Sequence, residues 1–162
     1  MITVCNTSPI SNLIQLDALS LLGSLFARIT IPLEVAEELD AGAEMLGTWR
    51  EAAGATVIEV LPVTNTDLVK ELSTTLHVGE AVAIALALQI PDAVLLIDEA
   101  DGRKAAMRRG LKLVGTVGIL LRAKEQQLIE RVEPYLQALR TKARFWLSDN
   151  LYNHALVSAG EK

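Results

Sequence analysis

Apolar residues gather in two kinds of stretch along the chain, and the two kinds alternate from one end to the other. Short runs rich in β-branched residues, with polar or turn-forming residues at their ends, are typical of buried strands. Such runs predict strands at 2–5, 56–61 and 94–97, a brief strand near 112–114, a short extended piece at 29–31 and an edge strand at 144–147. The chain is therefore expected to build a sheet from short strands.

The remaining apolar positions have helical spacing, and several helix starts carry their own signal. Ser8 followed by Pro9 is typical of an N-cap residue with proline at the first helical position, and Pro32 opens a helix that carries Glu38. Helices are predicted at 8–16, 19–26, 32–39, 41–54, 66–72 (capped by Thr66 or Asp67), 81–88, 102–109, 117–127 and 129–139, with a last one after Asp149. Ala81–Leu88 is apolar on nearly all sides, which indicates a central, buried helix.

Strands that alternate with helices are typical of an α/β fold with a mostly parallel sheet. The 162 residues fall within the usual size of one domain, and a hydrophobic content of 51% supplies a substantial core. We therefore predict a single α/β domain over residues 1–162.

Composition and charge narrow the class of protein further. The runs Ala81–Leu88 and Ala93–Ile97 are too short to span a bilayer, and no basic segment precedes an apolar one at the start, so we expect a soluble, cytoplasmic protein. Cys5 is the one cysteine, which excludes an intramolecular disulfide and a cysteine metal site. We expect it to be a small buried side chain. The net charge of -5 argues against broad adhesion to polyanions.

The apolar run 93–97 ends abruptly in Asp98-Glu99-Ala100-Asp101. Parallel sheets bind ligands beyond the carboxyl ends of their strands, which places Asp98 where chemistry is usually done. The same four letters fit a Walker B motif of ATPases. That interpretation also needs a G-x-x-x-x-G-K-[ST] phosphate loop, and the sequence has none. A helicase or P-loop ATPase is therefore disfavoured.

Four polar residues fall at predicted strand ends or on the helices that face them. They are Asn6 after the first strand, Glu38 in the helix after Pro32, Glu80 at the start of the buried helix, and Asp98. Carboxylate oxygens are the ligands that Mg²⁺ and Mn²⁺ prefer. A metal held by them lowers the pKa of a bound water and stabilises the charge on a phosphate under attack.

Each of these four residues also has a structural interpretation. Asn6 turns the chain through side-chain hydrogen bonds, Glu38 belongs to a solvated helix face, and Glu80 is favoured by the helix dipole. Asp98 is then the N-cap of the helix that follows it. All four residues are predicted to lie at the same edge of the sheet. The sequence therefore favours a metal site over four separate structural roles.

A basic segment follows the acids, and its members are Arg103, Lys104, Arg108, Arg109 and Lys112. These residues either contact phosphate beside the metal or form an ordinary solvated helix face. Arg103 lies one turn from the acids and is the best candidate for RNA contact, with Lys104 and Arg108 next. A second basic group near the chain end, Arg140, Lys142 and Arg144, could equally meet an acidic partner.

The histidines and tryptophans add little chemistry by themselves. His77 and His154 lack the spacing of metal ligands, so a capping or surface role is expected for His77. Trp49 and Trp146 are interpreted as packing or interface anchors and not as base-stacking platforms, because aromatic residues make up only 4% of the chain.

Five short motifs follow one another in a fixed order along the chain. They are Asn6-Thr7-Ser8-Pro9-Ile10; Ile31-Pro32 with Val35 and Glu38-Leu39; Gly79-Glu80 with Ala83-Ile84; Leu95-Leu96-Ile97-Asp98-Glu99 with Arg103 and Ala105-Ala106; and Gly115-Thr116-Val117-Gly118-Ile119-Leu120. Together they resemble the PIN-domain superfamily, specifically a subgroup of small prokaryotic PIN-like proteins. The resemblance runs from Ile2 to Leu147, and the order and spacing of the motifs make it specific.

That resemblance implies a three-layer α/β/α sandwich with a central parallel sheet and a Mg²⁺- or Mn²⁺-dependent ribonuclease site. By position, Asn6 takes the place of the first metal-binding Asp, and the other three acids, which are also the catalytic candidates, are Glu38, Glu80 and Asp98. Glu99 and Asp101 are auxiliary metal candidates. Thr7 or Ser8 matches a small hydroxyl residue that supports the first acid through a hydrogen bond.

Asn6 departs from the Asp of most active PIN nucleases, and an amide oxygen brings no charge to a metal. The leading hypothesis is a divalent-metal-dependent endoribonuclease acting on single-stranded or structured RNA. The resemblance adds that it is the toxin of a toxin–antitoxin pair, with a small antitoxin protein as partner, and that it forms a homodimer. One alternative is a non-catalytic PIN-like module that binds RNA or protein through an incomplete metal site. Another is a receiver domain that is phosphorylated on Asp98.

Overall fold

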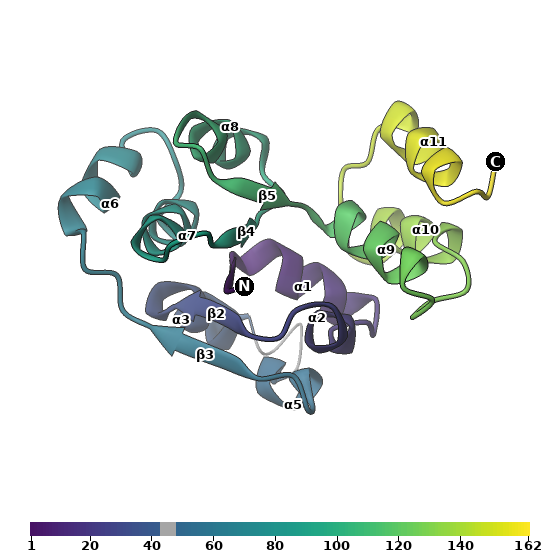
Figure 1. Cartoon of the computed structure of the whole chain (residues 1–162), viewed down its shortest axis with the longest axis horizontal. Helices are drawn as coiled ribbons and strands as arrows, with labels where there is room; N and C mark the ends of the chain where they lie inside the picture. The colour runs from purple at the N-terminus through teal and green to yellow at the C-terminus, as the bar shows by residue number, and fades with distance from the viewer. Residues whose placement is uncertain (43–47) are drawn as a thin grey trace.

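Five strands form one all-parallel sheet in a computed structural model that describes residues 1–42 and 48–162 (Figure 1). The strands are β1 (Thr3–Cys5), β2 (Ile29–Pro32), β3 (Ile58–Leu61), β4 (Val94–Leu96) and β5 (Lys112–Val114). Their order in the sheet is β3-β2-β1-β4-β5, so the chain winds outward from β1 to β3 and then returns to the other side of β1. The carboxyl ends of β1 and β4 flank this change of direction, which is where open α/β sheets place their ligands.

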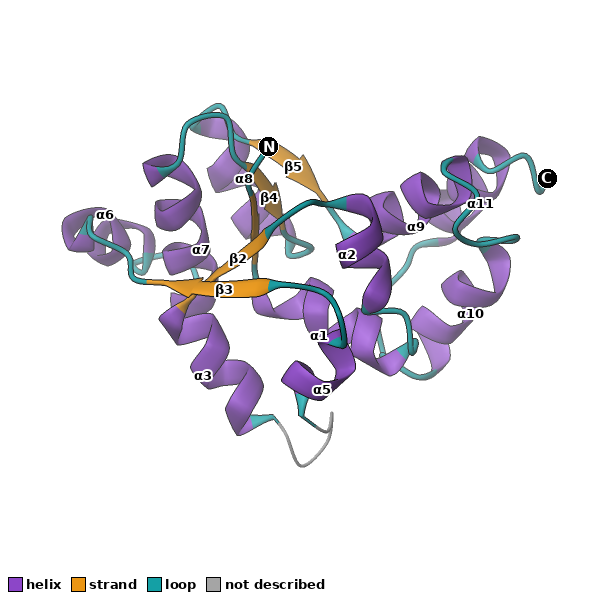
Figure 2. Ribbon diagram, turned by 60° about the horizontal axis from the view of Figure 1, so that its bottom comes forward, coloured by secondary structure: helices purple, strands orange, loops and turns teal. Residues whose placement is uncertain are grey.

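The described ranges contain ten helices, most of which pack around the sheet (Figure 2). They are α1 (Thr7–Gln15), α2 (Ser20–Leu25), α3 (Leu33–Ala41), α5 (Trp49–Ala53), α6 (Thr66–Leu72), α7 (Val78–Gln89), α8 (Ala100–Arg108), α9 (Thr116–Glu125), α10 (Glu133–Thr141) and α11 (Asp149–Ser158). The helices α9, α10 and α11 gather to one side of the sheet (Figure 2). The helices α6, α7 and α8 pack on one face, and the other helices share the core on the opposite face. The predicted α/β/α sandwich is confirmed. None of the described helices is long and apolar enough to cross a membrane.

The three inner strands, β2, β1 and β4, are buried at every position because successive side chains point to opposite faces and helices cover both faces. Val4 and Leu95 pack beneath α7, whereas Cys5 and Leu96 pack in the core on the opposite face, and all four are 0% exposed. Cys5 is therefore the small buried side chain that the sequence predicted. Burial, together with the negative charge of Asp98, raises the pKa of its thiol well above the ordinary range.

The helix α7 is the central, buried helix that its uniform hydrophobicity predicted, and every residue from Gly79 to Ala87 is buried. Its start is closed by a reciprocal cap. The Gly79 N–H donates to His77 Nδ1 at 3.3 Å, and the His77 N–H donates to Glu80 Oε2 at 3.0 Å. This arrangement satisfies N–H groups that a helix start otherwise leaves free. The capping role expected for His77 is confirmed.

The predicted start of the first helix, with Ser8 as its N-cap, is wrong. The helix α1 begins at Thr7 with Asn6 as its N-cap, so Ser8 lies inside the first turn. The Ser8 hydroxyl donates to Glu99 and not to the backbone of its own helix, a tertiary contact that local sequence does not reveal.

The cap of α6 also differs from the prediction. Asn65 caps this helix, because its Oδ1 accepts the Leu68 N–H at 3.1 Å, whereas Thr66 and Asp67 lie inside the first turn. Asparagine is as good an N-cap as serine or aspartate, so adjacent capping residues compete and propensity alone does not choose between them.

Three predicted extended or helical pieces change in extent. The stretch at 29–31 is the full central strand β2, paired with both β1 and β3. Residues 144–147 form no strand, and Arg144 has a φ of +50°, which ordinary strand geometry excludes. The helix predicted over 41–54 is represented by α5, and its residues 43–47 lie outside the described residues.

One buried hydroxyl in the sheet generates a stability prediction. Thr30 in β2 is 1% exposed, and its Oγ1 has no hydrogen-bond partner among the described residues. We expect Thr30→Val to raise the free energy of unfolding by about 1 kcal/mol, because valine has the same shape and removes an unsatisfied polar group. Urea denaturation of both proteins measures the change. An equal or lower stability would mean that the hydroxyl has a partner, such as a buried water.

Candidate functional site

Asn6 and Glu99 join the ends of β1 and β4. Asn6 is 3% exposed and donates from Nδ2 to Glu99 Oε2 at 3.2 Å. The Ser8 hydroxyl, in the first turn of α1, donates to Glu99 Oε1. Both oxygens of Glu99 thereby accept a hydrogen bond. The amide of Asn6 uses its nitrogen for Glu99, so its oxygen does not contact that carboxylate. Asn6 Oδ1 is buried and has no hydrogen-bond partner within residues 1–42 and 48–162.

Glu38 is held on α3 beside the start of α7. Thr7 Oγ1 donates to Glu38 Oε2 at 2.5 Å, while Glu38 Oε1 is buried and unpartnered within the described part of the chain. A Cβ atom on Gly79 would lie only 2.6 Å from Glu38 Oε1, so a larger residue there would displace the carboxylate. His77 Nδ1 is 3.6 Å from the same oxygen. The same nitrogen accepts the Gly79 N–H, so its hydrogen bond is to the start of α7.

Glu80 stands between the start of α7 and the start of α8. It is 8% exposed, and its Oε2 is engaged in the cap of α7. A Cβ atom on Gly102 would lie 2.9 Å from Glu80 Oε1, so α8 approaches this carboxylate closely. Burial raises the pKa of Glu80, and the negative charges of Glu99 and Asp101 raise it further.

These contacts link Asn6, Glu38, Glu80 and Glu99 into one group. Asn6 is bonded to Glu99, and the charge of Glu99 acts on Glu80. Glu38 abuts Gly79, the neighbour of Glu80, and is bonded to Thr7, the neighbour of Asn6. We call Asn6, Glu38, Glu80 and Glu99 the acid cluster. Its two unpartnered atoms, Asn6 Oδ1 and Glu38 Oε1, are called the open oxygens.

Asp98 is adjacent to the acid cluster, but its oxygens are bound by other groups. The Thr116 N–H donates to Asp98 Oδ1 at 2.7 Å, and Thr116 Oγ1 and Asn12 Nδ2 donate to Asp98 Oδ2 at 2.7 and 3.1 Å. Burial raises the pKa of Asp98, although these hydrogen bonds oppose the increase. Asp98 therefore closes the N-terminus of α9 and is not the N-cap of α8, a position that Glu99 occupies.

Asp98 and Glu99 differ in the residues that they contact. Glu99, expected only as an auxiliary acid, contacts Asn6, whereas the metal-binding role of Asp98 stays a prediction. Thr7 and Ser8 are bonded to Glu38 and Glu99 and not to Asn6. Asp101, the other auxiliary candidate, is an exposed residue in the first turn of α8.

Sequence reasoning missed Asn12 and Thr116, the two residues that bind Asp98. Thr116 immediately follows the predicted brief strand and Gly115, so its place at a strand end was an available signal. Asn12 lies within α1, and nothing in its local sequence distinguishes it from a solvated helical residue.

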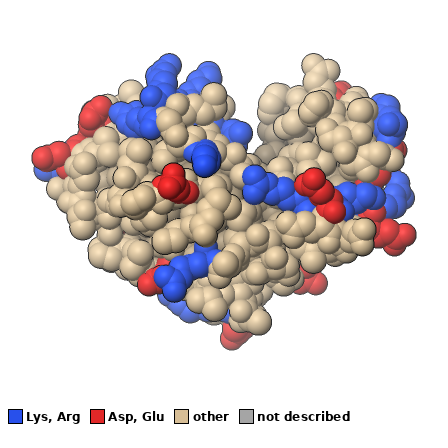
Figure 3. All heavy atoms as spheres, viewed as in Figure 1, with Lys and Arg blue, Asp and Glu red and all other residues tan. Residues whose placement is uncertain are grey.

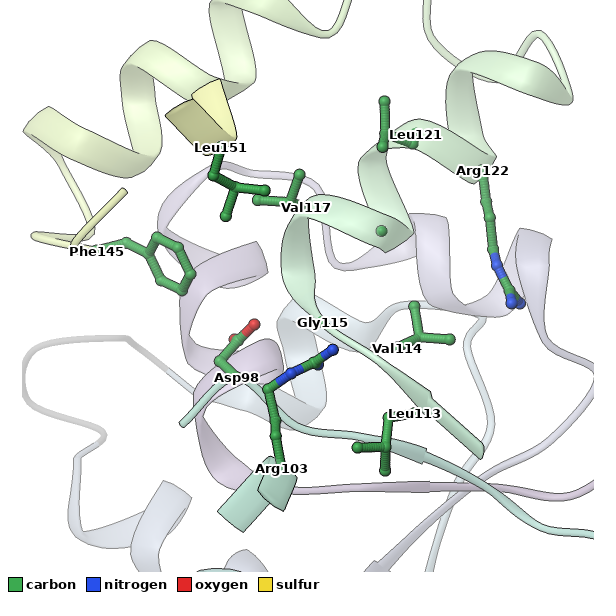
Figure 4. Close-up of a pocket in the computed structure, with 11 residues that line it drawn as sticks. Asp98, Arg103, Leu113, Val114, Gly115, Val117, Leu121, Arg122, Phe145 and Leu151 are labelled. Atoms are coloured by element: carbon green, nitrogen blue, oxygen red, sulfur yellow. The ribbon is translucent and has the colours of Figure 1, made fainter. Parts of the chain in front are cut away.

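The basic candidates divide between two sides of α8. Arg103 lines a pocket of about 400 Å³ together with Asp98 and Phe145, and its Nη1 donates to the Ile97 carbonyl at 2.8 Å (Figure 4). Lys104 and Arg108 line a separate hollow. The space-filling view shows Lys and Arg side chains gathered over α8 and a notch between that region and α11 (Figure 3). Of the three candidates, Arg103 is the one that shares a pocket with Asp98.

The oxygen donors of the acid cluster fit a hard divalent cation, which takes carboxylate, amide carbonyl and water oxygens. The open oxygens support this fit, because a buried acceptor with no donor is costly unless a cation or water meets it. In residues 1–42 and 48–162, no three Asp, Glu, His or Cys side chains are already arranged to hold an ion. Mg²⁺ does not need such an arrangement, because it keeps several waters and binds through one or two carboxylates.

A sequence model of a protein family, described as PIN domain, matches residues 2–161. No curated protein matches the chain. The family match covers nearly the whole sequence and agrees with the resemblance that the five motifs indicate.

The contact between Thr116 and Asp98 generates a second stability prediction. Thr116 is 0% exposed, and Thr116→Val removes the hydroxyl that donates to the carboxylate. We expect the free energy of unfolding at neutral pH to fall by about 1.5–3 kcal/mol, the usual loss for a hydrogen bond to a charged group. Thr30→Val is the matched control, since the same change there is expected to have the opposite sign. Equal stability of Thr116→Val and wild type in urea would contradict this role of the hydroxyl.

The raised pKa of Glu80 generates a pH prediction for metal-free protein. A carboxyl whose pKa is raised by folding contributes stability that is complete below its unfolded pKa, about 4.3, and is lost as the pH rises through the folded pKa. Glu80→Gln cannot ionise but keeps an oxygen for the His77 N–H. The quantity to compare is the melting temperature of the variant minus that of wild type. We expect this difference to be more positive at pH 8 than at pH 4. A difference that does not change with pH, in thermal scans with a chelator present, would contradict the shift.

Proposed function

The chain belongs to the PIN-domain family, and from that premise we propose that it is a divalent-metal-dependent endoribonuclease. PIN domains have a nuclease-type fold associated with nucleic-acid binding and generally use divalent metals. The proposal assigns this chemistry to the acid cluster and names the atoms that take part in it.

The open oxygens are the observation that carries the proposal. They lie at the edge of a parallel sheet where ligands bind, and Glu80 and Glu99 add negative charge beside them. No Lys or Arg side chain in the described ranges forms an ion pair with any member of the acid cluster. A cation held by Asn6 and Glu38 would meet these oxygens and offset the repulsion, whereas a purely structural role leaves both costs in place.

In the proposed site Asn6 and Glu38 would hold the ion through the open oxygens, and Glu99, whose two oxygens accept hydrogen bonds from Asn6 and Ser8, would add negative charge beside it. When bound, Mg²⁺ or Mn²⁺ supplies an activated water and stabilises negative charge on the phosphate. The Thr7 and Ser8 hydroxyls fix the orientation of Glu38 and Glu99.

Two acids have different roles in this proposal. Glu80, whose pKa is raised, is the member of the acid cluster best suited to take up and release a proton. Asp98, predicted as a ligand and a catalytic acid, acts as a positioning residue, because its oxygens hold Thr116 at the start of α9.

We propose RNA as the substrate and Arg103 as a phosphate contact. The chain has a net charge of -5, so attraction of a polyanion depends on the bound cation and a few local basic groups. Arg103 supports this assignment because it lines a pocket with Asp98, the neighbour of Glu99. The toxin role, the small antitoxin partner, the homodimer, the cytoplasmic location and the single-domain organisation stay predictions.

A second candidate function is a non-catalytic PIN-like module that binds RNA or protein. Asn6 favours it, because an amide supplies an oxygen without charge and therefore weakens metal binding relative to an Asp. The absence of a ready-made three-ligand site among the described residues favours it as well. The third hypothesis, a receiver domain phosphorylated on Asp98, is excluded by the family to which the chain belongs.

Cleavage of a labelled single-stranded RNA tests the proposed function. We expect cleavage with Mg²⁺ or Mn²⁺ and none with a chelator. Glu38→Gln and Glu99→Gln are each expected to lower kcat by about 100-fold or more, because each removes a negative charge at or beside the ion. Glu37→Gln, an exposed neighbour on α3, is the matched control and is expected to cleave like wild type.

The outcomes separate the two candidate functions. Cleavage that persists in the chelator, or that Glu38→Gln leaves unchanged, would contradict the assignment of the site. RNA binding without turnover under any metal condition would favour the non-catalytic module. Asn6→Asp adds the missing charge and is expected to bind Mn²⁺ more tightly than wild type in calorimetry.

A further inference from the structure

Trp146 is the most exposed large apolar side chain in the described part of the chain, with 85% of its surface accessible. The other tryptophan, Trp49, is 3% exposed and donates from Nε1 to Asp40 Oδ1 at 2.8 Å, so it is the packing residue that the sequence predicted. The same expectation of packing is wrong for Trp146. A large aromatic ring exposed to solvent is typical of a surface that binds a ligand or another macromolecule.

The backbone on both sides of Trp146 is fixed. The Phe145 N–H donates to the Leu139 carbonyl at 2.9 Å, and Arg140 Nη2 donates to the Leu147 carbonyl at 2.9 Å. Leu147 is buried and Phe145 is half-buried. Trp146 therefore projects from an anchored segment, and its exposure is not that of a loose loop.

Trp146 lines a pocket that reaches the acid cluster. The pocket has a volume of about 330 Å³, and its other walls include Ser8, Asn12, Asp98, Glu99 and Arg144. Asp98 and Phe145 also line the pocket that contains Arg103, which Figure 4 shows. Because the two pockets share these residues, they adjoin. An aromatic ring, two arginines and Glu99 of the acid cluster thus line two adjoining pockets.

We propose that Trp146 is a stacking platform for one base of a single-stranded nucleic acid, with Arg144 and Arg103 as contacts for the adjoining phosphates. This inference rests on the proposed function, and it adds where the strand lies relative to the acid cluster. Binding sites for single strands combine aromatic faces with cationic groups that follow the backbone, and this combination lines the two hollows.

The surroundings of Trp146 distinguish this occupant from a protein partner. Protein interfaces surround an exposed aromatic anchor with apolar, well-packed side chains and have few charges at the centre. Here Ala143 and Phe145 are the apolar neighbours of the ring, and the rest of the pocket lining is polar, with two carboxylates, a hydroxyl, an amide and a guanidinium. A nucleotide, which has one flat apolar face and many polar groups, matches that set of neighbours.

Binding of a short single-stranded RNA, measured with Ca²⁺ as a non-cleaving ion, tests the platform. Loss of one stacked base is expected to weaken affinity by about tenfold in Trp146→Ala. Trp146→Phe keeps an aromatic face and is expected to recover most of the affinity. Val157→Ala, an exposed apolar residue on α11 at 59% exposure, is the matched control and is expected to bind like wild type.

Tryptophan fluorescence gives a second readout that needs no change at Trp146. In Trp49→Phe the remaining emission comes from Trp146, because the chain has two tryptophans. We expect RNA to quench that emission and to protect it from acrylamide. Unchanged emission at saturating RNA, or equal affinity of Trp146→Ala and wild type, would overturn the platform.

Two further outcomes separate the platform from the proposed function. If wild type binds RNA through Trp146 but never cleaves it, the platform stands and the nuclease assignment fails. If wild type cleaves RNA and Trp146→Ala keeps the same KM and affinity, the nuclease stands and the platform fails. A dimer that dissociates in Trp146→Ala, with RNA affinity unchanged, would overturn the platform and identify this face as a protein interface.

Discussion

The parallel pairing of β1 with β4 brings Asn6 within hydrogen-bonding distance of Glu99, 93 residues further along the chain. The same pairing crowds carboxylates at one edge of the sheet. Two like charges 4 Å apart repel by about 4 kcal/mol at an effective dielectric constant of 20, which is a large part of the stability of a typical domain. Such a cluster persists only if hydrogen bonds, protons or a cation offset the repulsion.

Neighbouring elements supply part of that offset. The Thr7 and Ser8 hydroxyls donate to Glu38 and Glu99, and the His77 N–H donates to Glu80. Glycines at 79 and 102 let the backbone approach Glu38 and Glu80 closely. The open oxygens accept no hydrogen bond from the described residues. We therefore assign them to a cation.

Local sequence was enough to predict most of the fold, because short apolar strands and the uniformly apolar α7 have unambiguous patterns. It also predicted Asn6, Glu38 and Glu80 at the same edge, since the end of a strand, the helix that follows Pro32 and the start of the buried helix are local features. It did not separate Asp98 from Glu99. Adjacent residues after a strand point in different directions, and their partners, Thr116 and Asn6, come from distant segments.

The exposure of Trp146 was unpredictable for a related reason. It depends on anchors at Leu139 and Arg140 and on the positive φ of Arg144, none of which a composition-based argument detects. The low aromatic content favoured a packing role, whereas the structure leaves this one ring beside the acid cluster. Tertiary contacts, and not propensity, decide which aromatic residues remain available for binding.

The central claim is that the open oxygens are ligands of a divalent cation. Anomalous diffraction from crystals of this protein soaked in Mn²⁺ tests it most directly, because the signal locates the ion without reference to activity. The account predicts one strong peak in contact with Asn6 Oδ1 and Glu38 Oε1, and its loss in Glu38→Gln. A peak bound instead to Asp98, or no peak while both oxygens accept hydrogen bonds from ordered water, would contradict the account.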